Sequence, residues 1–385
     1  MMIYLDYAAT TPISGQALQV YNEVSKNYFG NTSSLHDTGT TASTLLEQCR
    51  IELSNLLHTS SKGIFFTSGG TESNILAIKA LLSANKDKGN HIITTVVEHS
   101  SLANYFLELE RDYGYSISYL DINCYGEVEL DQLATMIQDN TVLVSIQHGN
   151  SETGAVQAIE KIGQFLEGKG ILFHSDCVQT FGKLPIDLTK WNIDAISLSS
   201  HKIYGPKGVG ALYINPDLQW SIEFTNKNHE RGLRPGTINV PGIAAFVTAA
   251  QEVHEQLISE HTRFLQLRNS LISGLEDRNL NVEIISCSNQ LPNIIGMLLG
   301  DVQGDYAMLE FNRAGIAIST GSACSIGQQQ PSKTMLALGK SEERAKRFIR
   351  LSFGKGTNNS DIDRVLHVCS QILQQFEKKG FKYNE

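Results

Sequence analysis

The chain has 385 residues, of which 41% are hydrophobic and 18% are charged, and its formal net charge is −9 at pH 7. This length exceeds what one compact core usually holds, so we expect two structural units. The negative charge, without a lysine and arginine cluster interleaved with aromatic residues, argues against nucleic-acid binding. No apolar run approaches the roughly 20 residues of a membrane span, and the start lacks the pattern of a signal sequence. We therefore expect a cytoplasmic protein that does not enter a membrane.

Short β-branched segments alternate with longer amphipathic segments through the first part of the chain. The predicted strands are 64–67, 92–97, 142–147, 171–175, 193–198 and 211–214. This alternation predicts an α/β domain with a mostly parallel sheet covered by helices, in which ligands bind at the carboxyl ends of the strands. The chemistry should therefore lie just after each strand.

A long helical pattern after Gly242 marks the predicted domain boundary. Short strands at 282–286, 294–299 and 348–353, with a last helix capped by Ser360, then predict a smaller α+β domain. We assign residues 13–257 to the large domain, and residues 1–12 and 258–385 to the small domain.

The first predicted strand runs into the sequence Thr-Ser-Gly-Gly-Thr-Glu-Ser-Asn, residues 67–74. Its two glycines, one of which is Gly70, allow a tight turn before a helix begins near Thr71. The N–H groups and the dipole of a helix start favour a phosphate group, although the same residues also form an ordinary helix cap. His99 follows the second strand, where an imidazole can stack on a planar ring or serve a purely structural role.

The fourth predicted strand ends at Asp176, and Gln179 lies within one helical turn of it. A carboxylate in this place can pair with a pyridine nitrogen and keep it protonated, which makes the ring an electron sink. Alternatively, Asp176 caps the next helix.

The segment Ser-Ser-His-Lys-Ile-Tyr-Gly-Pro-Lys-Gly, residues 199–208, places Lys202 directly after the fifth strand. A semi-buried or cation-rich setting destabilises a lysine ammonium, so that the amine forms a Schiff base readily. Pyridoxal phosphate (PLP) is the cofactor that this chemistry suggests, and an ordinary surface lysine is the alternative. A phosphate cradle, an imidazole, a carboxylate and a lysine after successive strands of one sheet predict a single site.

On these residues the chain resembles the class V, fold type I PLP enzymes, and within them the NifS/IscS-type cysteine desulfurases. The resemblance runs nearly end to end and rests on motifs at 4–12, 66–74, 98–99, 199–208, 231–237 and 322–324. It implies a homodimer that converts L-cysteine to L-alanine and passes the sulfur, as a persulfide, to acceptor proteins. Iron–sulfur cluster assembly and tRNA thiolation are among the pathways that such acceptors serve.

The resemblance also implies roles for individual residues. Lys202 would hold the cofactor, Asp176 would pair with its pyridinium nitrogen, and His99 would stack on its ring. Gln179 would bind the phenolic oxygen, and Arg350 would bind the substrate carboxylate. A planar guanidinium suits this task because it can bind both carboxylate oxygens at once, and a surface charge on a strand is the alternative. The residues implied for the phosphate are Gly70, Thr71, Ser199 and His201, with Thr237 reaching it from the neighbouring subunit.

Cys324 lies in a small, polar segment, 319–332, which is almost without apolar residues and which we expect to be mobile. Cys49 and Cys369, in contrast, lie in apolar helical stripes that are typical of core packing. The cysteines include no C-x-x-C pair, so we expect neither a zinc ribbon nor a disulfide framework, and no metal. By the resemblance, the Cys324 thiolate attacks the substrate's γ-sulfur, after His99 or a substrate-derived proton transfer has generated it.

Three places differ from the usual family pattern, and one of them is the loop after Cys324, with Gly327 and three glutamines at 328–330. Ser151 stands where asparagine is more common, so either Ser151 or its neighbour Asn150 contacts the phenolic oxygen. Thr32 stands where proline is common, next to Asn31, which the pattern places near the substrate.

Two alternative functions stay open at this point. The nearer one is another enzyme of the same fold, such as a selenocysteine lyase or a small amino-acid lyase, epimerase or transaminase. The more distant one is a cofactor-free protein, either a hydrolase that uses Cys324 and a histidine or a catalytically idle scaffold.

Overall fold

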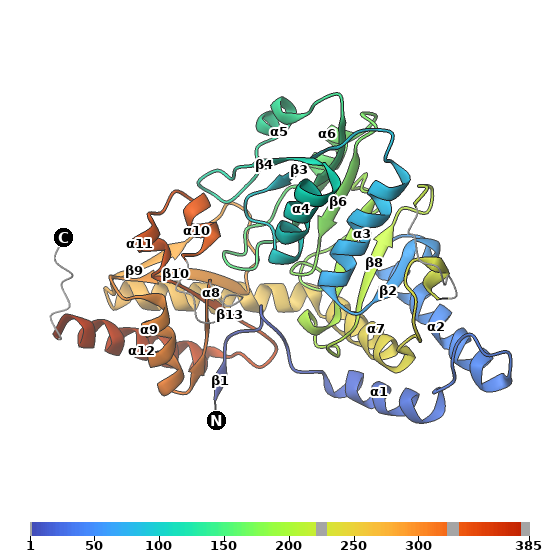
Figure 1. The fold of residues 1–385 in the computed structure, drawn as a ribbon. Coiled ribbons are helices and arrows are strands. Elements are labelled where there is room, and N and C mark those ends of the chain that lie inside the picture. Colours follow the sequence, from blue (N-terminus) through green and yellow to red (C-terminus); the bar gives the residue numbers. More distant parts are fainter. Residues whose placement is uncertain (1, 221–228, 322–330, 379–385) are drawn as a thin grey trace.

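A seven-stranded sheet and a four-stranded sheet, each with its own core, organise the described residues, and a run of two long helices joins them (Figure 1). The computed structural model describes residues 2–220, 229–321 and 331–378. Within these ranges no helix combines the length and the apolar character that crossing a membrane requires.

The larger sheet has the strand order β2-β8-β7-β6-β5-β3-β4. Its strands are β2 (Ile64–Thr67), β3 (His91–Thr95), β4 (Ser116–Leu120), β5 (Thr141–Ser145), β6 (Leu172–Asp176), β7 (Ala195–Ser199) and β8 (Gly210–Ile214). Neighbouring strands from β4 to β7 pair in parallel, and only β8 pairs antiparallel, with β7 on one side and β2 on the other, among the described residues. The predicted mostly parallel sheet is confirmed, and β4 adds an edge strand that the sequence pattern did not indicate.

Helices cover both faces of this sheet because its strands are apolar on both sides. Phe65 packs in one core with α3 (Gly70–Ala84) and α4 (Ser100–Tyr113). Its neighbours Ile64 and Phe66 point to the opposite face, as expected for a period of two, and pack with α2 (Asp37–Leu56), α6 (Ile159–Leu166) and α7 (Val240–Glu255). The shorter α1 (Gly15–Asn27) and α5 (Leu130–Met136) add Val24 and Leu133 to this second core.

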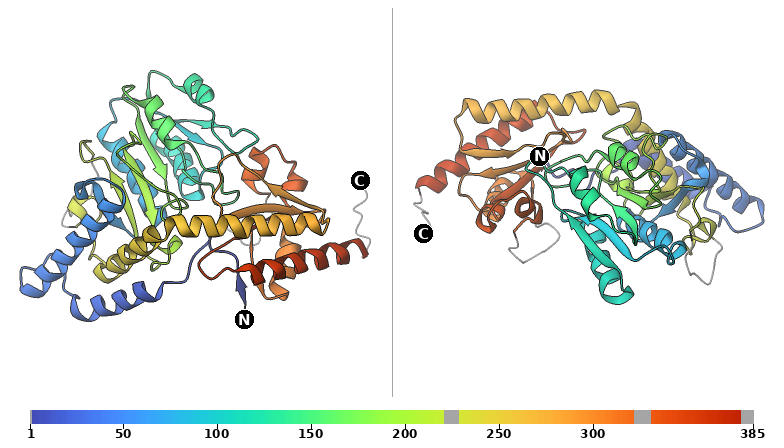
Figure 2. Two further views of the ribbon diagram at one scale, coloured as in Figure 1. Left: turned by 180° about the vertical axis from the view of Figure 1, so that it is seen from behind. Right: turned by 90° about the horizontal axis from the view of Figure 1, so that it is seen from above.

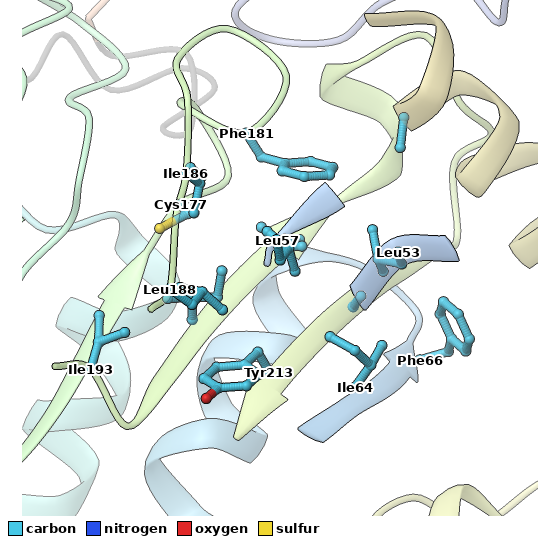
Figure 3. Close-up of a cluster of buried hydrophobic side chains, with 14 of the residues drawn as sticks. Leu53, Leu57, Ile64, Phe66, Cys177, Phe181, Ile186, Leu188, Ile193 and Tyr213 are labelled. Atoms are coloured by element: carbon cyan, nitrogen blue, oxygen red, sulfur yellow. The ribbon is translucent and has the colours of Figure 1, made fainter. Parts of the chain in front are cut away.

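Buried cysteines belong to these cores. Figure 3 shows Cys177 among Ile186, Leu188 and other apolar side chains, directly after the residue that ends β6. Burial raises the pKa of the Cys177 thiol, and it raises that of Cys49 to about 12, so both thiols stay protonated near neutral pH. We assign packing roles to them.

The helical pattern after Gly242 forms two helices instead of one. Helix α7 ends at Glu255 and α8 (Leu257–Asp277) begins after Gln256, whose φ of −98° and ψ of 2° lie outside the α-helical region. The views from behind and from above show α7 against the large sheet and α8 running along the small one (Figure 2).

The second sheet has the strand order β12-β13-β10-β9. Its strands are β9 (Val282–Ile285), β10 (Ile294–Leu299), β12 (Ser319–Thr320) and β13 (Phe348–Ser352). The helices of this part are α8, α9 (Gly304–Arg313), α10 (Lys333–Ala337), α11 (Glu342–Ala345) and α12 (Asn359–Lys378). Helix α12 begins one residue before the predicted cap Ser360, because the Asn358 side chain accepts the Ser360 N–H at 2.9 Å.

The N-terminal residues join this second part. Strand β1 (Ile3–Tyr4) pairs in parallel with β11 (Ile316–Ala317), and Ser352 N donates to Leu5 O at 2.7 Å. The break at Gln256 and these pairings support our proposal that residues 1–12 and 258–385 form one domain.

Candidate active site

A cavity of about 210 Å³ opens where the carboxyl ends of β6 and β7 meet the first turns of α3 and α4. Its lining consists of Gly70, Thr71, Asn74, His99, Gln147, Gly149, Ser151, Asp176, Val178, Gln179, Ser199, His201 and Lys202. Residues that are far apart in sequence meet here because parallel strands all end at the same edge of the sheet. The cavity thus brings together most of the residues that the sequence analysis predicted just after the strands.

Lys202 ends a short 3-10 turn, η2 (Ser200–Lys202), which directly continues β7. Its Nζ donates to the carbonyl oxygens of Ala8 and Ala9, both at 2.7 Å. These carbonyls belong to the N-terminal segment that also pairs with the small domain. The segment therefore holds the lysine amine at the junction of the two sheets and at the wall of the cavity.

Asp176 is the last residue of β6 and is only 7% exposed. Its Oδ1 accepts the Val178 N–H at 2.9 Å, and its Oδ2 accepts Asn74 Nδ2 at 2.7 Å. Among the described residues it makes no ion pair, so a buried anion faces the cavity without a cationic partner from this part of the chain. Such an arrangement suits a ligand that brings its own positive charge.

Asn74 is a site residue that the sequence analysis did not single out. Its Nδ2 also donates to Ser101 Oγ at 3.0 Å, and its Oδ1 is buried without a hydrogen-bond partner. A signal was present, because Asn74 lies four residues after Gly70 on α3 and therefore on the same helix face. Its partner Asp176, however, comes from another strand, which spacing alone cannot reveal.

His99 caps α4 and faces the cavity. Its Nδ1 lies 2.8 Å from Ser101 Oγ and accepts the Ser101 N–H at 3.2 Å. Desolvation lowers the pKa of His99, nearby Lys202 lowers it further, and Asp176 acts in the opposite direction. The lowered pKa favours the neutral imidazole at neutral pH, a form that can stack on a ring and accept a proton.

One end of the cavity suits an anion. Helix α3 starts at Gly70 after Gly69, without a side-chain cap, so its first N–H groups point toward the cavity's end. Gly70 is required there because a Cβ would lie 2.7 Å from Val178 Cγ2. Among the described residues, the buried Ser199 Oγ has no hydrogen-bond partner. A more open hollow of about 350 Å³ adjoins the cavity, shares Gly70 and His201 with it, and is also lined by Lys207.

His201 lies beside this end of the cavity. Desolvation, together with the charges of Lys202 and Lys207, lowers the pKa of its imidazole to about 4. Its Nδ1 lies 3.1 Å from Thr10 Oγ1. The ring is therefore neutral near pH 7 and can donate one hydrogen bond to an anion without adding charge.

The structure separates the two candidates for the contact near Gln179. Ser151 lines the cavity, whereas the Asn150 side chain is turned into its own loop, where its Oδ1 accepts the backbone N–H groups of Glu152 and Thr153, both at 2.9 Å. The lining of the cavity therefore favours Ser151 over Asn150 for this contact, and the contact stays a prediction.

Arg350 lies on β13, at the edge of the small domain that faces the cavity. Its Nη1 donates to the Ser151 carbonyl at 2.9 Å, and its Nη2 pairs with Asp6 Oδ1 at 2.5 Å. The Nε atom is buried without a hydrogen-bond partner. Arg350 does not line the cavity itself, but its bond to the Ser151 carbonyl places it next to a residue that does.

Of the predicted site residues that the structure describes, four are absent from the lining of the cavity: Asn31, Asn150, Thr237 and Arg350. Asn31 is exposed, and its side-chain oxygen accepts the Ser33 N–H at 3.0 Å within its own loop. Thr237 is also exposed and does not line the cavity of the same chain. Cys324 lies outside the described residues.

The donor set fits PLP. The Asp176 carboxylate, which forms no ion pair with the described residues, matches a protonated ring nitrogen, and the uncapped start of α3 with Ser199 Oγ matches a phosphate group. Lys202 lines the same cavity, and its amine donates to Ala8 O. No group of three or more potential metal ligands occurs among the histidines, cysteines and acidic residues within the described ranges.

The comparisons with known proteins agree with this chemistry. The family described as aminotransferase class-V matches residues 3–365. A "Putative cysteine desulfurase NifS" from Bacillus subtilis is 47% identical over 98% of this chain and 96% of its own length. A "Cysteine desulfurase IscS" from an Anaeromyxobacter species is 38% identical over 99% of this chain and 95% of its own length.

Solved structures give the same result. A "NIFS-LIKE PROTEIN" superposes with a TM-score of 0.91 at 31% identity and covers 97% of this chain and 100% of its own. A structure titled "SspA in complex with cysteine" has a TM-score of 0.80 at 32% identity and covers 91% of this chain and 98% of its own. From its sequence, its fold and the lining of its cavity, the chain belongs to the class V aminotransferase family.

Proposed function

We infer that the chain is a PLP-dependent cysteine desulfurase, which converts L-cysteine to L-alanine and takes the sulfur onto Cys324. The observation that carries this inference is the 47% identity, over nearly the whole of both chains, to a relative named as a putative cysteine desulfurase. A cavity in which a lysine amine, a buried carboxylate and an uncapped helix start converge supports it.

We assign the cofactor-binding roles from the lining of the cavity. Lys202 would hold PLP through its amine, Asp176 would keep the ring nitrogen protonated, and the start of α3 with Ser199 and His201 would bind the phosphate. The chemistry supplied by a cofactor held in this way would be an electron sink for the substrate's Cα. The remaining steps belong to groups of the chain itself.

Arg350 and His99 act on the substrate side. The Arg350 guanidinium binds the substrate carboxylate, while the bond from Nη1 to Ser151 O fixes the plane of the guanidinium. His99, whose pKa is lowered by desolvation, is neutral near pH 7 and can accept the proton of a thiol.

Sulfur transfer then needs a thiolate. The Cys324 sulfur attacks the γ-sulfur of the substrate, so that an S–S bond forms and the Cβ–S bond breaks. The electron pair of the broken bond goes to Cβ, which takes up a proton and leaves as part of alanine. A persulfide stays on Cys324, and its outer sulfur can pass to a thiol of an acceptor protein.

The setting of the enzyme follows from the family resemblance. We propose a cytoplasmic homodimer in which Thr237, which is exposed and does not line the cavity of its own chain, reaches the phosphate site of the partner subunit. The acceptors that we propose are iron–sulfur scaffold or tRNA-thiolation proteins.

The test uses purified protein with L-cysteine and a reducing thiol, and it measures alanine and sulfide. The wild type should release both in equal amounts, and Lys202→Ala should release neither. Cys324→Ala should keep the yellow colour of bound PLP but release no sulfide above background. A Cys324→Ala variant with the parental rate would contradict the role of Cys324, and activity with selenocysteine alone would make the protein a selenocysteine lyase.

A further inference from the structure

Lys183 is a partly buried lysine for which the proposed chemistry has no role. It ends the turn 177–183, which follows β6, and its backbone N–H donates to Thr180 O at 2.9 Å. Gly182 makes this path possible, because its φ is +71° and a Cβ there would lie 2.6 Å from Val253 Cγ2. The turn therefore returns Lys183 toward Gln179, which lines the cofactor cavity.

The ammonium of Lys183 makes two contacts with Gln179, one with its main chain and one with its side chain. Its Nζ donates to the Gln179 main-chain oxygen at 2.9 Å and approaches the side-chain Oε1 at 3.4 Å. Within the described residues it forms no ion pair with a carboxylate. Desolvation lowers the pKa of Lys183 to about 7, and the charges of Lys202 and Arg350 add to this effect.

The two neighbours of the Gln179 amide fix its orientation. An ammonium can only donate, so Oε1 must face Lys183, and a carbonyl can only accept, so Nε2 must face Ala8 O, to which it donates at 3.0 Å. An amide nitrogen has a second N–H donor, which is left for a ligand in the cavity. Lys183 thus determines which atom of Gln179 the ligand meets.

We propose that Lys183 is a positioning residue of the cofactor site, which holds Gln179 so that its amide N–H donates to the phenolic oxygen of PLP and which, in its protonated form, opposes protonation of the Lys202 nitrogen. This proposal rests on the assignment of PLP to the cavity and so on the proposed function. It adds a residue that acts through its neighbours without touching the substrate.

Other charged groups surround the two lysines and must be held constant in a test. On the cavity side they are His99, Asp176, His201 and Arg350 with its partner Asp6. A second, smaller cavity borders both lysines and is also lined by Tyr7, Tyr204, Glu260 and Lys355. A substitution of Lys183 leaves all of them in place, so that a change in titration reports the loss of the Lys183 amine, both its charge and its contacts with Gln179.

The experiment titrates the visible absorbance of the PLP-loaded protein with pH, without substrate. In Lys183→Met the midpoint should move to higher pH by about one unit, because a nearby positive charge and a hydrogen bond to the phenolic oxygen are both lost. Lys183→Arg, which keeps the charge, should restore a midpoint close to that of the wild type. Lys190→Met is the matched control, since Lys190 is exposed and pairs with Asp187 at 2.8 Å.

A Lys183→Met midpoint within about 0.2 unit of the wild type would overturn the proposal. If Lys183→Met does not fold, Lys183→Gln removes the charge while keeping a polar side chain, and its midpoint decides in the same way. A wild type that forms no visible band with PLP refutes both this proposal and the cofactor assignment. A wild type that has the band but makes no alanine refutes the proposed function alone, because the titration needs no turnover.

Discussion

Replacing Asn74 by alanine should weaken cofactor binding through Asp176, a residue that the substitution does not touch. Asn74 Nδ2 donates to Asp176 Oδ2 at 2.7 Å and holds the carboxylate that is proposed to meet the ring nitrogen. Among the described residues, the Asn74 Oδ1 accepts no hydrogen bond, so replacing Asn74 by alanine leaves no donor without its acceptor there. The loss should therefore appear in binding far more than in folding.

The size of the effect follows from this one bond. A hydrogen bond to a charged group contributes about 1.5–3 kcal/mol to stability or binding, and its loss corresponds to a dissociation constant that is roughly 10- to 150-fold larger. The Lys202→Ala background removes the covalent link, so that equilibrium dialysis against PLP measures the non-covalent contacts alone. The comparison is then between Lys202→Ala and the double variant that also carries Asn74→Ala.

Asn85→Ala, also in the Lys202→Ala background, is the control for truncating a buried asparagine of the same helix region. Asn85 is 8% exposed, and its Nδ2 donates to Leu81 O at 2.7 Å, at the far end of α3. It should leave PLP affinity unchanged. An Asn74→Ala affinity within a factor of two of its parent would refute the argument that Asn74 prepares Asp176 for the cofactor.

Two further predictions concern buried carboxyl groups. Burial raises the pKa of Glu98 to about 8, so the folded protein keeps a proton that the unfolded chain loses above its ordinary value of 4.5. Wild-type stability should therefore fall, relative to Glu98→Gln, as pH rises from about 5 to about 8, by an amount on the order of several kcal/mol in urea unfolding. Glu230→Ala should lower the free energy of unfolding by about 3–5 kcal/mol in the same assay, because it removes a buried carboxylate from the buried guanidinium of Arg50. The two Nη atoms of Arg50 donate to Glu230 at 2.9 and 3.0 Å.

Each of these two predictions has a result that would contradict it. Parallel pH profiles for the wild type and Glu98→Gln would mean that Glu98 is ionised in the folded protein. For the second, Glu47→Ala is the matched control, since Glu47 also contacts Arg50 but its side chain is 50% exposed, so that its loss should cost less than about 1 kcal/mol. An equal loss of unfolding free energy in both variants would contradict the argument that removing the buried partner of Arg50 is more destabilising than removing its exposed partner.

The strand ends were readable from the sequence because buried parallel strands are short, β-branched and apolar on both faces. Their order in the chain was enough to expect Asp176, His99 and Lys202 at one edge of the sheet, where the cavity lies. The direction of β8 was not readable, since an apolar strand has the same pattern in a parallel and in an antiparallel pair. Tertiary pairing decides it.

Contacts between distant residues account for most of what the sequence could not reveal. The link from Asn74 to Asp176 and the link from Lys183 to Gln179 depend on how turns and helices pack after the strands. The break at Gln256 was hidden because Val253 and Leu257 keep the i, i+4 spacing of one continuous helix across it. The role of Cys324 rests on the sequence and the family resemblance, because the residue lies outside the described ranges.

The most direct test of the central claim reduces the PLP-loaded protein with borohydride and maps its peptides by mass spectrometry. Reduction converts the link between the cofactor and its lysine into a stable secondary amine. We predict a pyridoxyl adduct on Lys202, with none on Lys183 or Lys207. An adduct on a different lysine, or no adduct in fully loaded protein, would contradict the account.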